Sequence, residues 1–362
     1  MKKITIIAGA RPNFIKIAPL IHAIQQAQLL HHTIEYRLVH TGQHYDAKMS
    51  DTFFTELNIP QPNANLACGG GTQAEQTAAI MIAFEKELIA NPCNLVIVVG
   101  DVTSTMACSI VAKKLNTKVA HIEAGIRSFD ITMPEEINRM VTDSITDYFF
   151  TTTQLANENL KRAGIEDQRI FFVGNIMIDT LLKNVPKFAK PAVFDTLGLI
   201  QKNYIVMTLH RPANVDEGST LKTLISEIIN NVQGLPIIFP IHPRTASIFA
   251  ELGISGTNLH TIEPLGYLHF NYLVQHAKAV ITDSGGITEE TTVMGVPCIT
   301  LRDNTERPET CIIGTNELIG TDSKNIAPAM QKLFAGQWKK GGIPPLWDGH
   351  TATRIVDHLI AL

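Results

Sequence analysis

Short apolar runs alternate with helix-length segments along almost the whole of this 362-residue chain. The runs of the first half are ITIIA, YRLVHT, NLVIVVG and KVAHIE, and those of the second half are YIVMTL, PIIFP, NLHTI, AKAVIT and VPCITL. Such an alternation is typical of parallel β-sheets with helices on their faces. Because no fixed sequence period accompanies it, we predict two α/β domains and exclude a solenoid.

The chain length also favours about two domains. The best candidate for a linker is the weakly patterned stretch KNVPKFAKPAVFD, residues 183–195, which contains two prolines and three lysines. We therefore expect an N-terminal domain over residues 1–185 and a C-terminal domain over residues 186–345. The Pro- and Gly-rich stretch GGIPPLWDG then leads into a last amphipathic helix within residues 346–362.

Composition narrows the classes of function. The apolar runs are too short to span a bilayer and the first one reads as a strand, so we expect a cytoplasmic protein with no membrane partner. The 30 basic residues are dispersed and the net charge is −4, which argues against a nucleic-acid partner. The five cysteines are scattered without a CxxC or metal-like histidine pattern, so we expect reduced thiols and no metal site.

In open parallel sheets, ligands bind outside the carboxyl ends of the strands, so the residues after each run matter most. The first run is followed by GARPNFIKIAP, which is neither a Walker loop nor a GxGxxG turn. Its Arg11 and Lys16 could add positive charge to a helix N-terminus that already favours anions. The alternative is a turn with two solvated cations.

Acidic residues follow the third and fourth runs. Asp101 stands in GDVTSTMA, and HIEAGIRSFDITMPEEINR contains Glu123 and the pair Glu135 and Glu136. Each of them alone is compatible with a structural role, and Asp101 could cap a helix that starts at Thr103. Taken together, they indicate acid/base chemistry at the strand ends.

Cations follow two runs of the second half. His210 precedes Arg211 in TLHRPANVD, and His242 stands two residues before Arg244 in PIHPRT. A lone histidine in such a place is often a structural residue that is held by hydrogen bonds. If the strands are parallel, however, both pairs lie on the same rim, and this favours phosphate binding.

The stretch TDSGGITEE follows the run AKAVI. We expect Ser284 to be the N-cap of a helix, and Gly285 and Gly286 to let backbone N–H groups approach phosphate oxygens. Glu290 lies about one and a half turns further on and could accept hydrogen bonds from the two hydroxyls of a ribose. Because many α/β proteins have a glycine-rich turn for packing alone, this reading depends on the rest of the chain.

The motifs taken together resemble those of the non-hydrolysing UDP-N-acetylglucosamine 2-epimerases. They are GARPNFIKIAPL, TGQHYD, GDVTST, HIEAGIRS, MPEEINR, TLHRPANVD, TDSGGITEE, RDNTERPE and DGHTATRIVDHL, in the order of that family. The resemblance implies a GT-B fold, in which two Rossmann-like, doubly wound parallel-sheet domains face each other across a cleft and the last helix packs on the first domain. It also implies a homodimer that needs neither nicotinamide nor metal.

The resemblance implies a reaction on a UDP-sugar, in which the C2 proton is removed while UDP leaves from C1. UDP then adds back to the 2-acetamidoglucal intermediate after reprotonation on the opposite face, and the product serves cell-surface polysaccharide synthesis. The positions that match the family's catalytic group are Asp101, Glu123, Glu135 and His210. The expected substrate-binding positions are Arg11, Lys16, Arg139, His242, Ser284, Gly285, Gly286, Glu290 and Arg307.

Two departures from the family pattern stand out. The family's commoner opening is GTRPE, whereas Asn13 takes the place of that glutamate here. Gln43 and His44 are followed by Tyr45 and Asp46, without the glutamine that the family associates with a second, allosteric UDP-GlcNAc. We therefore expect the usual allosteric activation to be absent.

Four alternatives share parts of this pattern. A hydrolysing UDP-GlcNAc 2-epimerase would release free N-acetylmannosamine, and a relative could act on another UDP-acetamido or uronic sugar. A GT-B glycosyltransferase would bind UDP in the same way but would need an acceptor site. A non-catalytic sugar-nucleotide sensor would not need Asp101, Glu123 and His210, which are all present.

Overall fold

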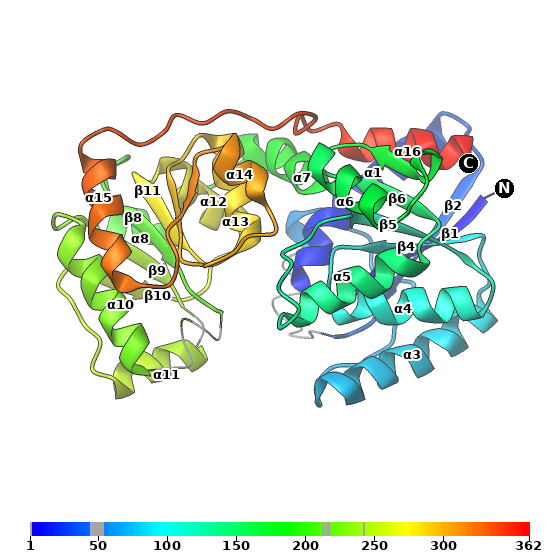
Figure 1. Ribbon diagram of the computed structural model, residues 1–362, viewed down its shortest axis with the longest axis horizontal. Helices are drawn as coiled ribbons and strands as arrows, with labels where there is room; N and C mark the ends of the chain where they lie inside the picture. Colours follow the sequence, from blue (N-terminus) through cyan, green and yellow to red (C-terminus); the bar gives the residue numbers. More distant parts are fainter. Residues whose placement is uncertain (1, 44–53, 212–213, 215–217, 242) are drawn as a thin grey trace. The chain divides into compact units, whose positions relative to one another are not determined.

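The computed structural model describes residues 2–43, 54–211, 214, 218–241 and 243–362 (Figure 1). The chain forms two compact units. Unit 1 comprises Met1–Lys183 and Pro345–Leu362, and unit 2 comprises Asn184–Pro344. Within the described residues, no helix is both long enough and apolar enough to cross a membrane.

Unit 1 is built on a parallel sheet with strand order β3-β2-β1-β4-β5-β6-β7. Its strands are β1 (Lys2–Ala8), β2 (Ile34–His40), β3 (Ala64–Asn65), β4 (Leu95–Val99), β5 (Lys118–Ala124), β6 (Tyr148–Thr151) and β7 (Ile170–Phe172). Its helices are α1 (Arg11–Leu29), α3 (Gln73–Ala90), α4 (Thr103–Lys114), α5 (Pro134–Ile145), α6 (Gln154–Arg162), α7 (Ile176–Asn184) and α16 (Thr351–Ala361). The strand order reverses direction between β1 and β4, which makes the sheet doubly wound.

Local sequence explains these elements. All five residues of β4, LVIVV, are buried, as expected of a central strand that is covered on both faces. Helix α3 begins at a capping box, in which Thr72 Oγ1 accepts the Glu75 N–H at 3.2 Å and Glu75 Oε2 accepts the Thr72 N–H at 2.8 Å. Its inner face then places Ile80, Phe84 and Leu88 in the core at helical spacing.

The C-terminal segment belongs to unit 1, where α16 packs against α1 (Figure 1). The carboxylate of Asp179 in α7 accepts the backbone N–H groups of Thr351 at 3.1 Å and Ala352 at 2.7 Å. It therefore satisfies two of the N–H groups that a helix start leaves without partners. Trp347, just before the helix, is also buried.

Unit 2 repeats the plan with strand order β10-β9-β8-β11-β12-β13, again with all strands parallel. Its strands are β8 (Ile205–Thr208), β9 (Ile237–Pro240), β10 (Leu259–Ile262), β11 (Ala279–Thr282), β12 (Cys298–Thr300) and β13 (Asn316–Leu318). Its helices are α8 (Ala192–Thr196), α10 (Gly218–Asn231), α11 (Pro243–Glu251), α12 (Tyr267–His276), α13 (Gly285–Met294), α14 (Pro308–Ile312) and α15 (Ile326–Phe334). The reversal falls between β8 and β11, so the predicted class of two doubly wound α/β domains is confirmed.

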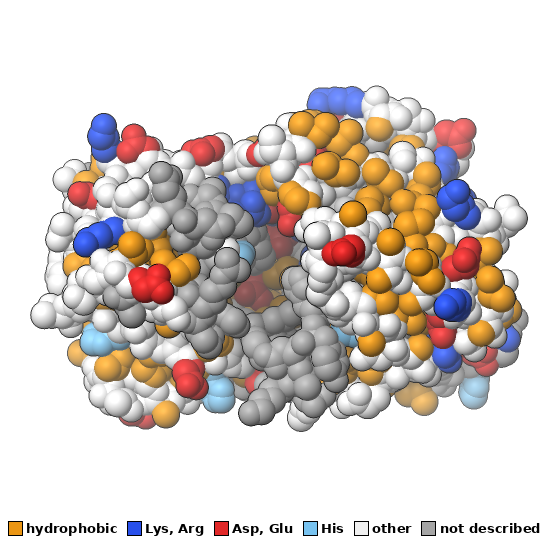
Figure 2. Space-filling model, turned by 90° about the horizontal axis from the view of Figure 1, so that it is seen from below, with side chains coloured by type: hydrophobic (Ala, Val, Ile, Leu, Met, Phe, Trp, Pro, Cys, Tyr) orange, Lys and Arg blue, Asp and Glu red, His pale blue; other side chains and the backbone are white. Residues whose placement is uncertain are grey.

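Unit 1 also exposes apolar side chains on its helices. Ile82 and Ile89 of α3 are 58% and 64% exposed, and Ile137 and Met140 of α5 are 45% and 47% exposed. Figure 2 shows hydrophobic side chains spread over the face of unit 1 that is drawn there. Contiguous apolar surface of this kind often marks an interaction site.

Candidate active site

Most of the described candidate site residues lie at or after the carboxyl ends of strands near each reversal point. In unit 1 these strands are β1, β4 and β5, and in unit 2 they are β8 and β11. Arg307 follows β12. The crevice at such a point is where doubly wound sheets bind their ligands. Each unit therefore has its own set of candidate site residues near its reversal point.

The turn after β1 is held by Asn13. Its Oδ1 accepts the N–H groups of Gly9 at 2.9 Å and Ala10 at 3.0 Å, and its Nδ2 donates to the carbonyl oxygen of Val99 at 2.9 Å. The amide thus ties the start of α1 to the end of β4. Asn13 stands where the family's commoner opening has a glutamate, and its amide joins the ends of β1 and β4.

Lys16 and Glu123 form a buried ion pair in unit 1, with Nζ 2.7 Å from Oε2. Glu123 lies at a register shift of β5 and has a φ of +72°. Because a residue with a side chain seldom adopts this conformation, the bulge is a strained feature of the kind found at functional sites. At Gly100, also at positive φ, an added Cβ would lie 3.1 Å from Lys16 Nζ and 3.6 Å from Glu123 Oε2, so the pair lies against the turn after β4.

Asp101 follows Gly100 and pairs with Arg139 of α5, with Nη1 2.5 Å from Oδ2. Arg139 is buried and also contacts Glu136, with Nη2 2.7 Å from Oε2. Asp101 is one-third exposed, at 33%, so its carboxylate remains open to a ligand. Helix α4 has Val102 as its N-cap, so the alternative in which Asp101 caps that helix is wrong.

Neighbouring glutamates of α5 have different surroundings. Glu136 is buried and its carboxylate accepts the N–H groups of Ser128 at 2.9 Å and Phe129 at 3.1 Å. Burial raises the pKa of Glu136, but the hydrogen bonds from Ser128 and Arg139 outweigh it and lower the pKa overall. Glu135 is exposed in the first turn of the helix, and its catalytic role stays a prediction.

In unit 2, His210 is held by Asp283, with Nδ1 2.7 Å from Oδ1. The Asp283 carboxylate is fully buried, whereas the imidazole is 62% exposed, so the ring presents its outer face to solvent. The carboxylate also accepts the backbone N–H groups of His210 at 3.0 Å and Arg211 at 2.9 Å. Burial raises the pKa of Asp283, but the His210 contacts outweigh it and lower the pKa overall.

Helix α13 begins at the glycine pair after β11. Ser284 is its N-cap residue as predicted, but its side chain makes no hydrogen bond to the first turn. An added Cβ on Gly285 would lie 2.6 Å from Glu306 Oε1, and Glu306 is itself held by Arg302 at 2.6 Å. The start of α13 thus lies against a charged pair and carries the N–H groups that favour an anion.

The two glutamates that close TDSGGITEE are both buried. Glu289 Oε1 lies 2.6 Å from Arg307 Nε, and Glu290 Oε1 accepts the Tyr267 hydroxyl at 2.7 Å. Burial raises the pKa of Glu290 to about 7, although the hydrogen bond from Tyr267 acts in the opposite direction. Arg307 is therefore placed in an ion pair behind α13, and its role in substrate binding stays a prediction.

Comparison with known proteins shows the family to which this chain belongs. A family model described as UDP-N-acetylglucosamine 2-epimerase matches residues 27–360. The UDP-N-acetylglucosamine 2-epimerase of Methanocaldococcus jannaschii is 42% identical over 98% of each chain. The chain belongs to the UDP-N-acetylglucosamine 2-epimerase family.

Other members of the family extend the comparison. A crystal structure of the M. jannaschii enzyme in complex with UDP-GlcNAc and UDP matches with a TM-score of 0.90 at 40% identity, over 99% of this chain and 100% of that one. The UDP-2,3-diacetamido-2,3-dideoxy-D-glucuronate 2-epimerase of Pseudomonas aeruginosa is 38% identical over 100% of both chains. The family resemblance inferred from the motifs is thus confirmed.

The structure does not describe some of the residues that the family resemblance singles out. His242 and the stretch from His44 to Asp46 are among the residues that the structure does not describe, and the side chain of Arg11 is likewise undescribed. The predictions for phosphate binding and for a missing allosteric site at these positions stay predictions. Within the described residues, no group of three or more His, Cys, Asp or Glu side chains could hold a metal ion.

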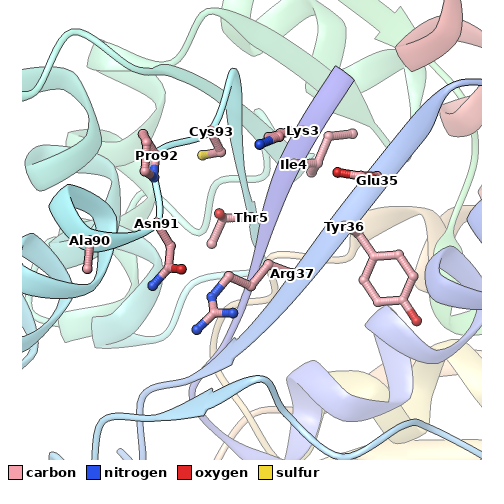
Figure 3. A pocket seen from close by; sticks show the side chains of 10 residues that line it. All are labelled: Lys3, Ile4, Thr5, Glu35, Tyr36, Arg37, Ala90, Asn91, Pro92 and Cys93. Atoms are coloured by element: carbon pink, nitrogen blue, oxygen red, sulfur yellow. The ribbon is translucent and has the colours of Figure 1, made fainter. Parts of the chain in front are cut away.

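A hollow of about 300 Å³ in unit 1 lies apart from these residues (Figure 3). It is lined by Lys3–Thr5 of β1, Glu35–Arg37 of β2 and the Ala90–Cys93 segment before β4. These are the amino-terminal halves of the strands, and the candidate site lies at their carboxyl ends.

Sequence reasoning missed two acidic residues that support the candidate site. Asp283 supports His210, and Glu306 packs against Gly285. For Glu136, the contact with Arg139 was not predicted. Each stands within or next to a motif that was singled out, so a search for partners of the motif cations could have found them. Burial raises the pKa of Glu306, but Arg302 outweighs it and the pKa is lowered to about 2.

Proposed function

We propose that this protein is a non-hydrolysing UDP-N-acetylglucosamine 2-epimerase that interconverts UDP-GlcNAc and UDP-ManNAc. The observation that carries the proposal is the pair of carboxylates, Asp101 and Glu123, at the reversal point of unit 1. They stand in a chain that is 42% identical, over nearly its full length, to a relative of that name. Acid/base groups at this place are what removal and return of the C2 proton require.

The two units supply different parts of the reaction. In unit 2, the N–H groups at the start of α13 and the exposed ring of His210 bind the diphosphate, and Glu290 accepts the ribose hydroxyls. In unit 1, Asp101, Glu123 and Glu135 handle the proton at C2 and stabilise positive charge at C1 as the C1–O bond lengthens. Lys16 holds the buried Glu123 carboxylate in place, and Arg139 holds the partly exposed Asp101 carboxylate.

The reaction balances without an external oxidant. Removal of the C2 proton and departure of UDP form a C1–C2 double bond, and the electron pair of the C1–O bond leaves with UDP. A proton then returns to C2 from the opposite face and UDP adds to C1, which restores the bond count. Because the proton leaves from one face of the sugar and returns to the other, turnover needs acid/base residues on both faces.

The deciding test is proton NMR of the purified protein with UDP-GlcNAc in deuterated water, with a chelator present and no cofactor added. We expect UDP-ManNAc that carries deuterium at C2, because the returning proton comes from solvent. Free N-acetylmannosamine with UDP would instead identify a hydrolysing epimerase. An unchanged spectrum would exclude UDP-GlcNAc as the substrate.

A second candidate substrate is a UDP-2,3-diacetamido-uronate. The observation in its favour is the 38% identity to the P. aeruginosa enzyme over 100% of both chains. Its C3 acetamido and C6 carboxylate groups would need donors that UDP-GlcNAc does not use. The same NMR experiment with this sugar nucleotide distinguishes the two, since the true substrate exchanges its C2 proton faster at equal concentration.

We also infer a homodimer and a cytoplasmic role in polysaccharide synthesis. The exposed apolar side chains of α3 and α5 support the homodimer, because a second copy would remove them from water. Light scattering should give twice the mass of the 39.8 kDa chain. Ile82→Lys together with Ile89→Lys should give the single-chain mass, and a dimer that survives both changes would exclude α3 from the interface.

A further inference from the structure

A buried histidine lies directly behind the acidic residues of unit 1. His121 of β5 is fully buried, with Nδ1 2.7 Å from Asp143 Oδ1 and Nε2 2.8 Å from the carbonyl oxygen of Gly100. Gly100 immediately precedes Asp101, and Glu123 lies two residues after His121. Neither His121 nor Asp143 belongs to the proposed catalytic set, so both need an explanation of their own.

Both partners of the His121 ring are acceptors. A carbonyl oxygen can only accept, and Asp143 already receives Arg127 Nη1 at 2.6 Å and the Gly125 N–H at 3.1 Å. Burial raises the pKa of Asp143, but His121 and Arg127 lower it overall. Acceptance of both the Arg127 guanidinium and the Gly125 N–H is the pattern of an ionised carboxylate. The ring must therefore donate from both nitrogens, and only an imidazolium can do so.

Helix α5 fixes three acceptors of the turn that carries Asp101. Asn138 Nδ2 donates to the Asp101 carbonyl oxygen at 2.8 Å, and Arg139 holds the Asp101 carboxylate at 2.5 Å. Asp143, one turn further along the helix, reaches the Gly100 carbonyl through His121. A movement of α5 would therefore move the backbone and side chain of Asp101 together.

The same carboxylate also spans the bulge that carries Glu123. Asp143 pairs with His121 on one side of the bulge and accepts the Gly125 N–H on the other. Between these two anchors, Glu123 has a φ of +72°. Such a conformation persists only where the surroundings over-determine it, and Asp143 provides two of the required contacts.

We propose that His121 and Asp143 are positioning residues for the epimerase reaction, in which a buried imidazolium fixes the Gly100–Asp101 turn and the Glu123 bulge as one rigid unit. Neither residue needs to touch the sugar for this role. The inference rests on the proposed function, because it assumes that Asp101 and Glu123 act on the substrate. The protonation of His121 can be measured without substrate, however, and this separates the two claims.

The first measurement is a proton–nitrogen NMR spectrum of the full chain labelled with 15N-histidine, at pH 7 and without substrate. We expect both ring nitrogens of His121 to carry protons, and the signal is assigned by its loss in His121→Gln. In Asp143→Asn the ring should lose one proton, because the buried imidazolium then faces Arg127 without a compensating charge. A wild-type His121 with a single ring proton would overturn the proposal.

The second measurement is turnover, with UDP binding as the check on folding. Asp143→Asn should lower kcat by about 10- to 100-fold with little change in KM, because small misplacement of catalytic groups costs rate. The matched control is Asp147→Asn, which removes a carboxylate of the same unit that pairs with Lys113 at 2.9 Å. This variant should keep a kcat near that of the wild type.

Each outcome of these experiments decides a separate point. Equal kcat values for Asp143→Asn and Asp147→Asn would overturn the positioning role, even if His121 is doubly protonated. If Asp143→Asn does not fold, His121→Gln replaces it, since its amide can donate only to one side and should lower kcat in the same way. A wild-type chain that turns over no UDP-sugar but shows the doubly protonated ring would reject the proposed function alone.

Discussion

The two units have the same strand order around their reversal points and both contain buried ion pairs, but their candidate site residues differ in exposure. In unit 1, charges neutralise each other in the interior, as the pairs Lys16 with Glu123 and Arg139 with Glu136 show. In unit 2, the buried carboxylate of Asp283 supports an exposed imidazole, and the first turn of α13 receives no bond from its N-cap side chain. One fold thus provides a rigid set of acids in unit 1 and open donors for an anion in unit 2, so the loops after the strands and not the topology set the chemistry.

The sharpest test of this contrast is the stability of unit 1 when its interior pairing is broken. Lys16→Met leaves the Glu123 carboxylate buried without its ion pair, and we expect the free energy of unfolding to fall by about 3–5 kcal/mol. Urea denaturation measures this loss, and hydrogen exchange of the unit 1 amides tests whether it falls in unit 1. The double variant Lys16→Met with Glu123→Gln removes both charges and should recover most of it.

A surface pair of the same unit supplies the control. Lys113 and Asp147 are 34% and 27% exposed, so Lys113→Met should cost only about 1 kcal/mol or less. If Lys16→Met lowered the free energy of unfolding no more than Lys113→Met does, the interior pair would contribute no more to stability than the surface pair.

The second test asks whether proton transfer and nucleotide binding can be separated by unit. Asp101→Asn keeps the shape of the side chain but removes its acid/base capacity, so we expect kcat to fall by about 100-fold or more. UDP affinity, measured by calorimetry, should stay unchanged because its proposed binding residues lie in unit 2. Asp167→Asn, at an exposed pair with Lys161, is the control. Wild-type turnover in Asp101→Asn would remove this residue from the mechanism.

Much of the fold could be predicted from the sequence because it depends on patterns that are local. The buried strands are near-continuous apolar runs, and helix α5 begins at Pro134, a residue type favoured in the first turn of a helix. Helix α13 begins at the predicted glycine pair. These elements follow from period and capping, which neighbouring residues fix.

The arrangement of side chains within the site was less predictable. Successive helix positions point about 100° apart, so the sequence Glu135–Glu136 does not show which carboxylate faces the core. The structure places Glu136 inside and Glu135 outside. Likewise, the contacts of Asp143 with His121 and Arg127 join residues that are far apart in sequence, and only packing brings them together.

A third test probes how closely the start of α13 is fitted. In Gly285→Ala, the new methyl group would meet the Glu306 carboxylate, which Arg302 holds in place. We expect UDP affinity to fall by about tenfold, as overpacking by one methyl group costs 1–3 kcal/mol. Adding Glu306→Asp, which shortens that side chain but keeps its charge, should restore much of the affinity. Unchanged calorimetric affinity in Gly285→Ala would show that the glycine is not required there.

The smallest expected effect concerns Glu290, a buried carboxylate of unit 2 whose pKa lies near neutrality. Burial raises the pKa of Glu290 to about 7 in the free protein, so this group stabilises the folded state fully below pH 4.5, its ordinary value, and loses that contribution as the pH rises through 7. Only the ionised form can accept both ribose hydroxyls. The ionised fraction rises about tenfold between pH 6 and pH 8, but the protonated form can still accept one ribose hydroxyl, so the affinity for UDP-GlcNAc should increase by less, about three- to fivefold.

The choice of ligand and control makes this pH effect interpretable. UDP-GlcNAc is preferred to UDP because its diphosphate is esterified at both ends and does not titrate in this range. Glu290→Gln cannot ionise, so its affinity should stay flat across the same titration. If wild type and Glu290→Gln gave parallel curves, another group would control binding, and the exposed ring of His210 would be the next residue to change. If only the wild type responds to pH, the buried Glu290 carboxylate takes part in binding. Both units then contain a buried acid, and they differ in how fully that acid is paired, since Glu123 of unit 1 has Lys16 as its partner.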